Sequence, residues 1–149
     1  MSEQIIGVVG AGTMGQGIAQ VVAASGFTTR LYDVADEQLT RAEGNIEKGL
    51  GKLVSKEKMA SADKDAAMAR LSTTTALEAL ADCAIIIEAA PEQPALKEKL
   101  FRDLSNLSSQ AILASNTSSL SLTRLAAVCE RPERGVGMHF FNPVPVLKL

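Results

Sequence analysis

The chain has 149 residues, 46% of them hydrophobic and 21% charged, and its formal net charge at pH 7 is -2. A chain of this length forms one domain with its own apolar core, and the composition is ordinary for a globular protein. The slightly acidic balance and the 3% of aromatic residues argue against a nucleic-acid partner, and no apolar run reaches the roughly 18 residues of a membrane span.

The N-terminal part of the chain predicts a βαβ unit. Residues 4–9 are rich in Ile and Val, which is typical of a strand buried on both faces. A glycine cluster follows, and the Ala-rich residues 16–25 predict a helix that Gly26 ends. Residues 28–32 are a second β-branched run, and Asp33 follows directly. Because a helix joins the two strands, we expect them to pair in parallel.

Residues 36–69 predict one long helix or two, because apolar residues recur every three or four positions. This stripe consists of Leu39, Ala42, Ile46, Leu50 and Leu53. Three glycines in the same stretch each weaken a helix by roughly 1 kcal/mol relative to Ala. They indicate either close approach by a ligand or neighbour, or a loosely held arm.

Three further strands are predicted at residues 71–75, 83–88 and 111–114. Between the last two, leucines from Leu96 to Leu107 mark a helical face, and Pro94 fits the first turn of that helix. A helix at residues 121–129 and a strand at residues 135–139 complete the pattern. The alternation predicts an α/β fold of the Rossmann type, a doubly wound and mostly parallel sheet with helices on both faces.

Cys83 and Cys129 form neither a CxxC motif nor a zinc-ligand pattern, so we predict no metal site. No basic segment precedes the first apolar run, which argues against a secretory signal. We therefore expect reduced thiols and a cytoplasmic protein.

The glycine cluster matches the dinucleotide-binding pattern G-x-G-x-x-G. Its residues are Gly10, Ala11, Gly12, Thr13, Met14 and Gly15. The pattern is weak alone, but here it follows a predicted strand, opens a helix and precedes an acidic residue at the end of the next strand. Gly10 would permit the tight turn, Gly12 the approach of backbone to the pyrophosphate, and Gly15 the close packing of helix and strand. The start of the helix would offer free N–H groups and its positive dipole end to the phosphates.

Asp33 is placed to accept hydrogen bonds from the adenosine ribose hydroxyls, and its carboxylate would repel a 2′-phosphate. Val34 stands where an NADP enzyme often has Arg, so NAD is the expected cofactor. We expect Arg30, two residues upstream of Tyr32, to point elsewhere. The alternative is a glycine turn followed by a solvated Asp.

Four segments together resemble signature segments of the 3-hydroxyacyl-CoA dehydrogenase family: GAGTMGQGIA at residues 10–19, EAAPEQPALK at 88–97, ASNTSS at 114–119 and GMHFFNPV at 137–144. The resemblance covers essentially the whole chain. It implies oxidation of an (S)-3-hydroxyacyl-CoA to the 3-ketoacyl-CoA (acetoacetyl-CoA in the shortest case), with hydride passing to NAD, as in fatty acid β-oxidation. It also implies that residues 1–149 form the NAD-binding domain, cut near its C-terminal end, without the family's helical second domain.

The resemblance places the catalytic His at His139, which is the only His of the chain. Imidazole titrates near working pH and suits removal of the hydroxyl proton. Ser118 matches the Ser that touches substrate and cofactor, and with Asn116 it would hold the substrate oxygen and the carboxamide end of the cofactor. From the residues alone, His139 is more often structural, and the run at residues 116–119 is more often a turn and helix cap.

Further cofactor-side positions of the family fall on Glu92, Lys97 and Asn142. Without the resemblance, Glu92 and Lys97 would be interpreted as surface charges. The CoA-binding Lys of the family matches Lys56, in the charged stretch SKEK, whereas the accompanying Ser is Gly49 here. We therefore predict a substrate contact at Lys56 and leave the second contact open.

In the family a Glu beyond Leu149 pairs with the catalytic His, and the second domain closes the cleft and forms a homodimer interface. We therefore expect the isolated chain to bind NAD weakly and to turn over little substrate. Two alternatives stay open: a dehydrogenase of free hydroxy acids, and a dinucleotide-binding protein without chemistry. The pair formed by His139 and the SNTSS run argues against the second, because a pure binder needs neither.

Overall fold

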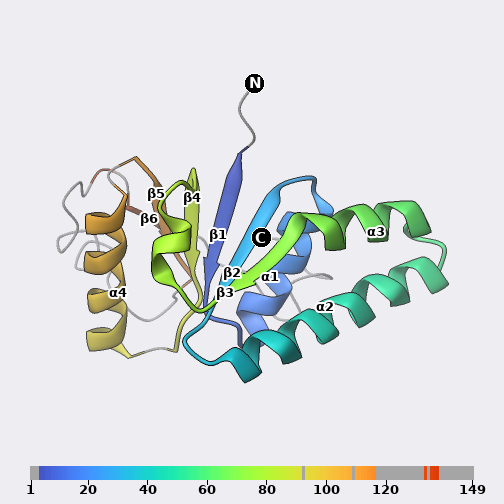
Figure 1. Cartoon of the computed structure of the whole chain (residues 1–149), viewed down its shortest axis with the longest axis horizontal. Coiled ribbons are helices and arrows are strands. Elements are labelled where there is room, and N and C mark those ends of the chain that lie inside the picture. Colours follow the sequence, from blue (N-terminus) through green and yellow to red (C-terminus); the bar gives the residue numbers. More distant parts are fainter. Residues whose placement is uncertain (1–3, 92, 109, 117–132, 134, 138–149) are drawn as a thin grey trace.

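The computed structural model describes residues 4–91, 93–108, 110–116, 133 and 135–137. It is an α/β structure in which helices cover both faces of a single sheet (Figure 1). The strands are β1 (Ile5–Val9), β2 (Thr28–Tyr32), β3 (Leu71–Thr74), β4 (Ile85–Glu88), β5 (Ile112–Ser115) and β6 (Gly135–Gly137). The strand order is β3-β2-β1-β4-β5-β6, and every neighbouring pair is parallel. The predicted doubly wound fold is confirmed.

The strand order reverses between β1 and β4, which are neighbours although two strands separate them in sequence. The register brings Val9 beside both Tyr32 and Glu88, and Glu88 beside Ser115. These four residues end their strands, so the loops that follow β1, β2, β4 and β5 lie along one edge of the sheet. Open α/β sheets bind ligands at this edge, outside the reversal point.

The helices are α1 (Thr13–Ala24), α2 (Asp36–Ser55), α3 (Ser61–Arg70) and α4 (Pro94–Leu107), with a 3-10 helix η1 (Leu77–Leu80). In Figure 1, α1, α2 and α3 lie on one side of the sheet, and α4 and η1 lie on the other. The stretch predicted as one helix or two is two, and the break carries Glu57 in the left-handed region at φ 58°. The helix predicted to begin at residue 16 begins at Thr13 instead. Nothing in the sequence pattern indicated η1.

Each side of the sheet has its own apolar core. The larger core joins β1 to α1, α2 and α3, and the predicted stripe of α2 enters it with Leu39, Ala42, Ile46 and Leu50 buried. The smaller core joins the other side of the sheet to α4 and η1, through residues such as Phe101 and Leu80. The arm formed by α2 and α3 is therefore packed against the domain, chiefly through α1, and is not loosely held.

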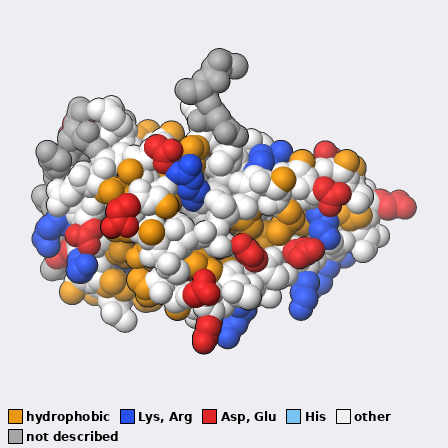
Figure 2. Space-filling model, viewed as in Figure 1, with side chains coloured by type: hydrophobic (Ala, Val, Ile, Leu, Met, Phe, Trp, Pro, Cys, Tyr) orange, Lys and Arg blue, Asp and Glu red, His pale blue; other side chains and the backbone are white. Residues whose placement is uncertain are grey.

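Figure 2 shows acidic and basic side chains interspersed over the face in view. Among the described residues, no helix is long and apolar enough to cross a bilayer. The helix predicted at residues 121–129 and the last two residues of the strand predicted at 135–139 lie outside the described residues.

Candidate functional site

The turn after β1 requires glycine at two positions. Gly10 has φ +106°, a conformation that side chains rarely adopt, and a Cβ there would lie 2.7 Å from the carbonyl oxygen of Ala89. A Cβ on Gly15 would lie 1.6 Å from the carbonyl oxygen of Gly10. Both distances are shorter than real Cβ contacts, so these glycines let the turn pass close to the backbone just after β4 and let α1 begin directly on the turn.

Gly12 has a different environment. It is the exposed N-cap of α1, and a Cβ on it would meet nothing within 4 Å. No side chain caps this helix. Its first turn starts with Thr13 and Met14 and contains no acidic residue. The first N–H groups of a helix have no partner within the helix, and they carry the positive end of its dipole. This open end fits an anionic phosphate group, and the bare backbone at Gly12 leaves space for it.

The carboxylate of Asp33 joins β2 to the glycine turn. Its Oδ2 accepts a hydrogen bond from the N–H of Ala11 at 2.9 Å, and its Oδ1 accepts one from the N–H of Ala35 at 2.9 Å. A carboxylate has about four acceptor positions, and the residue is half-exposed. Asp33 can therefore hold the turn and still accept hydrogen bonds from ribose hydroxyls. The sequence did not indicate the bracing role.

Arg30 points away from this carboxylate, as expected. Its guanidinium donates to the carbonyl oxygen of Ala79 at 2.6 Å and forms an ion pair with Asp82. The hydrogen bond from Arg30 lowers the pKa of the Asp82 carboxyl. Val34 beside Asp33 is exposed to solvent.

Two side-chain amides connect the arm to the glycine turn. Gln16 on α1 donates from Nε2 to the carbonyl oxygen of Ala11 at 3.0 Å, and Asn45 on α2 donates from Nδ2 to Oε1 of Gln16 at 2.9 Å. We name this path the amide bridge. The apolar stripe of residues 36–69 leaves out Asn45, but nothing in the sequence indicated that Asn45 meets Gln16.

A buried polar cluster lies at the ends of β4 and β5. The side chains of Glu88, Lys97 and Ser115 are at most 1% exposed. Lys97 Nζ donates to Glu88 Oε1 and Oε2 at 3.0 and 2.9 Å, and Ser115 Oγ donates to Oε1 at 2.7 Å. The interpretation of Lys97 as a surface charge is therefore wrong. A signal was present, because Lys97 shares the core-facing side of α4 with Phe101 and Leu104, at helical spacing.

The structure places some of the remaining predicted site residues. Asn116 directly follows β5, and its N–H donates to the carbonyl oxygen of Glu88 at 2.8 Å, so it lies at the same edge as the glycine turn. Lys56 is exposed at the far end of α2, which at 1.5 Å per residue lies about 30 Å from the start of that helix. Four predicted site residues lie outside the described residues: Glu92, Ser118, His139 and Asn142.

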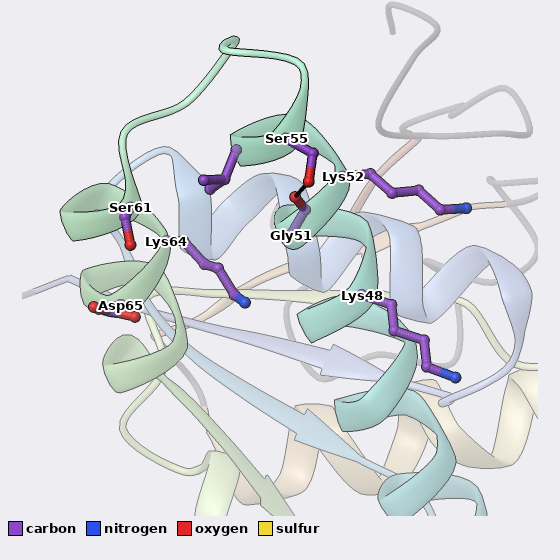
Figure 3. Close-up of a pocket in the computed structure, with 8 residues that line it drawn as sticks. Lys48, Gly51, Lys52, Ser55, Ser61, Lys64 and Asp65 are labelled. Atoms are coloured by element: carbon purple, nitrogen blue, oxygen red, sulfur yellow. Dashed lines mark hydrogen bonds between the residues drawn. The ribbon is translucent and has the colours of Figure 1, made fainter.

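The arm carries a groove between α2 and α3, lined by Lys48, Gly51, Lys52, Val54, Ser55, Ser61, Lys64 and Asp65. Figure 3 shows Lys64 reaching from α3 toward α2, while Lys48 and Lys52 extend from α2 away from α3. Three lysines and one Asp give the groove a positive balance, and Lys56 is the next residue in sequence after the lining residue Ser55. Gly49 is not part of it, because a Cβ there would lie 2.5 Å from Oε1 of Gln20 on α1.

Comparison with known proteins is consistent with this geometry. A 3-hydroxybutyryl-CoA dehydrogenase of Bradyrhizobium diazoefficiens is 45% identical over 145 residues, which are 97% of this chain and 50% of that protein. A 3-hydroxyadipyl-CoA dehydrogenase of Escherichia coli is 43% identical over 98% of this chain and 31% of that protein. The crystal structure of an (S)-3-hydroxybutyryl-CoA dehydrogenase from Ralstonia eutropha superposes with a TM-score of 0.95 at 44% identity, covering 99% of this chain and 53% of that one.

The chain thus spans about half or less of the length of these relatives. Residues 5–149 match the family described as "3-hydroxyacyl-CoA dehydrogenase, NAD binding domain". The match includes the glycine turn, Asp33 and the buried cluster. The chain therefore belongs to the 3-hydroxyacyl-CoA dehydrogenase family, as its NAD-binding domain.

Proposed function

We propose that this chain provides the cofactor domain of an enzyme that oxidises an (S)-3-hydroxyacyl-CoA to the 3-ketoacyl-CoA with NAD. The observation that carries the proposal is the open N-terminus of α1 at Gly12, beside the carboxylate of Asp33. These two features fit the pyrophosphate and the adenosine ribose of one dinucleotide. The relatives, named for 3-hydroxybutyryl-CoA and 3-hydroxyadipyl-CoA, support the substrate class.

Different groups of the chain would bind different parts of the cofactor. The amides at Gly12, Thr13 and Met14 would hold the phosphates, and Asp33 would accept from the ribose hydroxyls and repel a 2′-phosphate. When bound, NAD supplies the hydride acceptor. Glu92, Lys97 and Asn142 belong to the same proposal as cofactor-side residues, with Lys97 acting from within the core.

The proton chemistry is assigned to three further residues. We propose that His139 removes the hydroxyl proton of the substrate, which a well-placed base accelerates by roughly 10²- to 10⁴-fold. Ser118 and Asn116 would hold the substrate oxygen and the carboxamide of the cofactor. The position of Asn116 at the carboxyl edge of β5 supports this assignment.

The lysine-rich arm favours a CoA thioester over a free hydroxy acid. Lys56 is exposed and directly follows Ser55 of the positive groove in sequence, and it would meet phosphate groups of CoA. At the position of the family's Ser, the amide of Gln20 occupies the space that a side chain on Gly49 would need. A homodimer formed through the remaining part of the relatives, and a cytoplasmic location, belong to the same proposal.

Two measurements test the proposal. Fluorescence titration of the chain should show tighter binding of NADH than of NADPH, and the proposal fails if the two bind equally or if neither binds. Reduction of acetoacetyl-CoA by NADH should then be compared with reduction of free acetoacetate, using this chain and a longer version that includes the counterpart of the relatives' second half. The variant His139→Asn should retain NADH binding and lose turnover. Activity on acetoacetate alone would favour the free-acid alternative.

A further inference from the structure

The buried cluster at the ends of β4 and β5 gathers an unusual number of donors on one carboxylate. Glu88 accepts four hydrogen bonds: two from Lys97 Nζ, one from Ser115 Oγ, and one from the N–H of Ala90 at 2.6 Å. Both ionic groups are out of reach of solvent. Taking two charges out of water is costly, and apolar residues of similar volume often stabilise a core equally well. Stability alone therefore does not account for this pair.

Two of the groups that Glu88 holds lie at the ligand edge, one just after β4 and one at the end of β5. The N–H of Ala90 lies in the loop after β4, and this loop packs against Gly10, whose Cβ position is 2.7 Å from the carbonyl oxygen of Ala89. Ser115 ends β5, and the next residue, Asn116, donates its N–H to the carbonyl oxygen of Glu88. One carboxylate thus fixes Ala90 in the loop after β4 and Ser115, the residue that leads into the loop after β5.

These loops lie across the reversal point from Asp33. The order β2-β1-β4-β5 puts the ends of β4 and β5 on one side of the crevice and Asp33, after β2, on the other. A doubly wound sheet places the two nucleotide halves of a dinucleotide on either side of this point. Since Asp33 suits the adenosine half, the ends of β4 and β5 that Glu88 joins fall on the nicotinamide side.

We propose that Glu88 is a positioning residue for the nicotinamide half of the cofactor. Its carboxylate keeps Lys97, Ser115 and the N–H of Ala90 in place, so that the described residues directly after β4 and at the end of β5 keep one arrangement. Lys97 is fully buried and donates to both carboxylate oxygens, so Glu88 also fixes the position of the Lys97 ammonium. This inference rests on the proposed function, because it requires a dinucleotide in the crevice.

The test compares NADH with ADP-ribose, which lacks only the nicotinamide ring. The paired variant Glu88→Gln/Lys97→Met removes the ion pair without leaving a lone buried charge. We expect its Kd for NADH to rise about tenfold, as the loss of a single good polar contact would cause, while the Kd for ADP-ribose stays within about twofold. The matched control is Lys99→Met/Asp103→Asn, which removes an exposed ion pair of 3.0 Å from the same helix and should change neither Kd.

The outcomes separate positioning from a merely structural role. If the paired variant binds both ligands as the wild type does, or if both Kd values rise by the same factor, the inference is overturned. If the paired variant does not fold, Ser115→Ala should raise the Kd for NADH selectively and Ser115→Thr should restore it; unchanged binding by Ser115→Ala would overturn the inference. A wild-type chain that binds neither ligand would refute the proposed function before any variant is compared.

Discussion

Substitution by Ala should have different effects at the three glycines of the turn, and Gly12→Ala is the most informative variant. Its φ and ψ, -75° and -168°, are open to any residue, and the added Cβ would meet nothing within 4 Å. Substitution lowers the conformational entropy of the unfolded chain, which stabilises the fold, but Ala is less favourable than Gly at an N-cap, which destabilises it. The two effects on the free energy of unfolding are opposite in sign and roughly 0.5–1 kcal/mol each. The free energy of unfolding should therefore change by less than about 1 kcal/mol.

Binding should respond much more strongly. The methyl group of Gly12→Ala would stand where the phosphates must approach the backbone, and we expect the Kd for NADH to rise at least about tenfold, or 1.4 kcal/mol. Gly15→Ala should act in the opposite way, because its Cβ would lie 1.6 Å from backbone and α1 must shift. It should lower the free energy of unfolding by about 1–3 kcal/mol or more.

Urea unfolding followed by circular dichroism gives the stability, and NADH fluorescence titration gives the Kd. The control is Gly44→Ala on α2, where a Cβ also meets nothing within 4 Å. It should gain about 0.5–1 kcal/mol of stability and leave binding unchanged. A folded Gly12→Ala variant with wild-type affinity for NADH would refute the reasoning, since the bare backbone would then have no function.

Three more predictions concern charged or titratable side chains. Asp33→Asn keeps one acceptor oxygen but removes the repulsion of a 2′-phosphate, so competition titration should show the ratio of the NADPH Kd to the NADH Kd falling about tenfold; an unchanged ratio contradicts the assignment. Glu88→Gln alone removes the carboxylate that faces the buried ammonium of Lys97 and should lower the free energy of unfolding in urea by about 3–5 kcal/mol, whereas a loss below about 1 kcal/mol would show that the pair is not ionic. Burial raises the pKa of the Cys83 thiol from 9.0 to about 11, so its thiolate fraction at pH 8 should be about a hundredfold lower in the folded chain. Iodoacetamide labelling read by peptide mass spectrometry should spare Cys83 in the native protein and not in urea, and the stability that the protonated thiol contributes should be lost between about pH 9 and pH 11.

Most of the fold could be predicted because its signals are local. Apolar β-branched runs marked the strands within one or two residues, and β2 has the predicted bounds. The start of α1 was predicted three residues late, because glycines weaken helices. In the structure Gly15 belongs to the first turn, since only a residue without a side chain lets α1 begin against the turn. The four residues of η1 are too few to show a helical period.

The residues of the candidate site could be predicted where the local structure can be formed by only one or two residue types. The glycines and Asp33 are examples, since positive φ, bare backbone and a carboxylate at a strand end each have few substitutes. The helical spacing of Lys97 to Phe101 and Leu104 indicated its burial, but its pairing with Glu88 could not be predicted from sequence. The pairing depends on a contact between β4 and α4 that no local pattern contains.

The amide bridge helps to hold the glycine turn in one conformation before any cofactor binds. Ala11 is fully buried, with its N–H held by Asp33 and its carbonyl oxygen held by Gln16. The turn is therefore ordered when the chain folds, and an incoming nucleotide has little backbone entropy left to remove. Because Asn45 extends this network into the arm, we expect Asn45→Ala to quicken the exchange of cofactor, which stopped-flow dissociation of NADH would reveal.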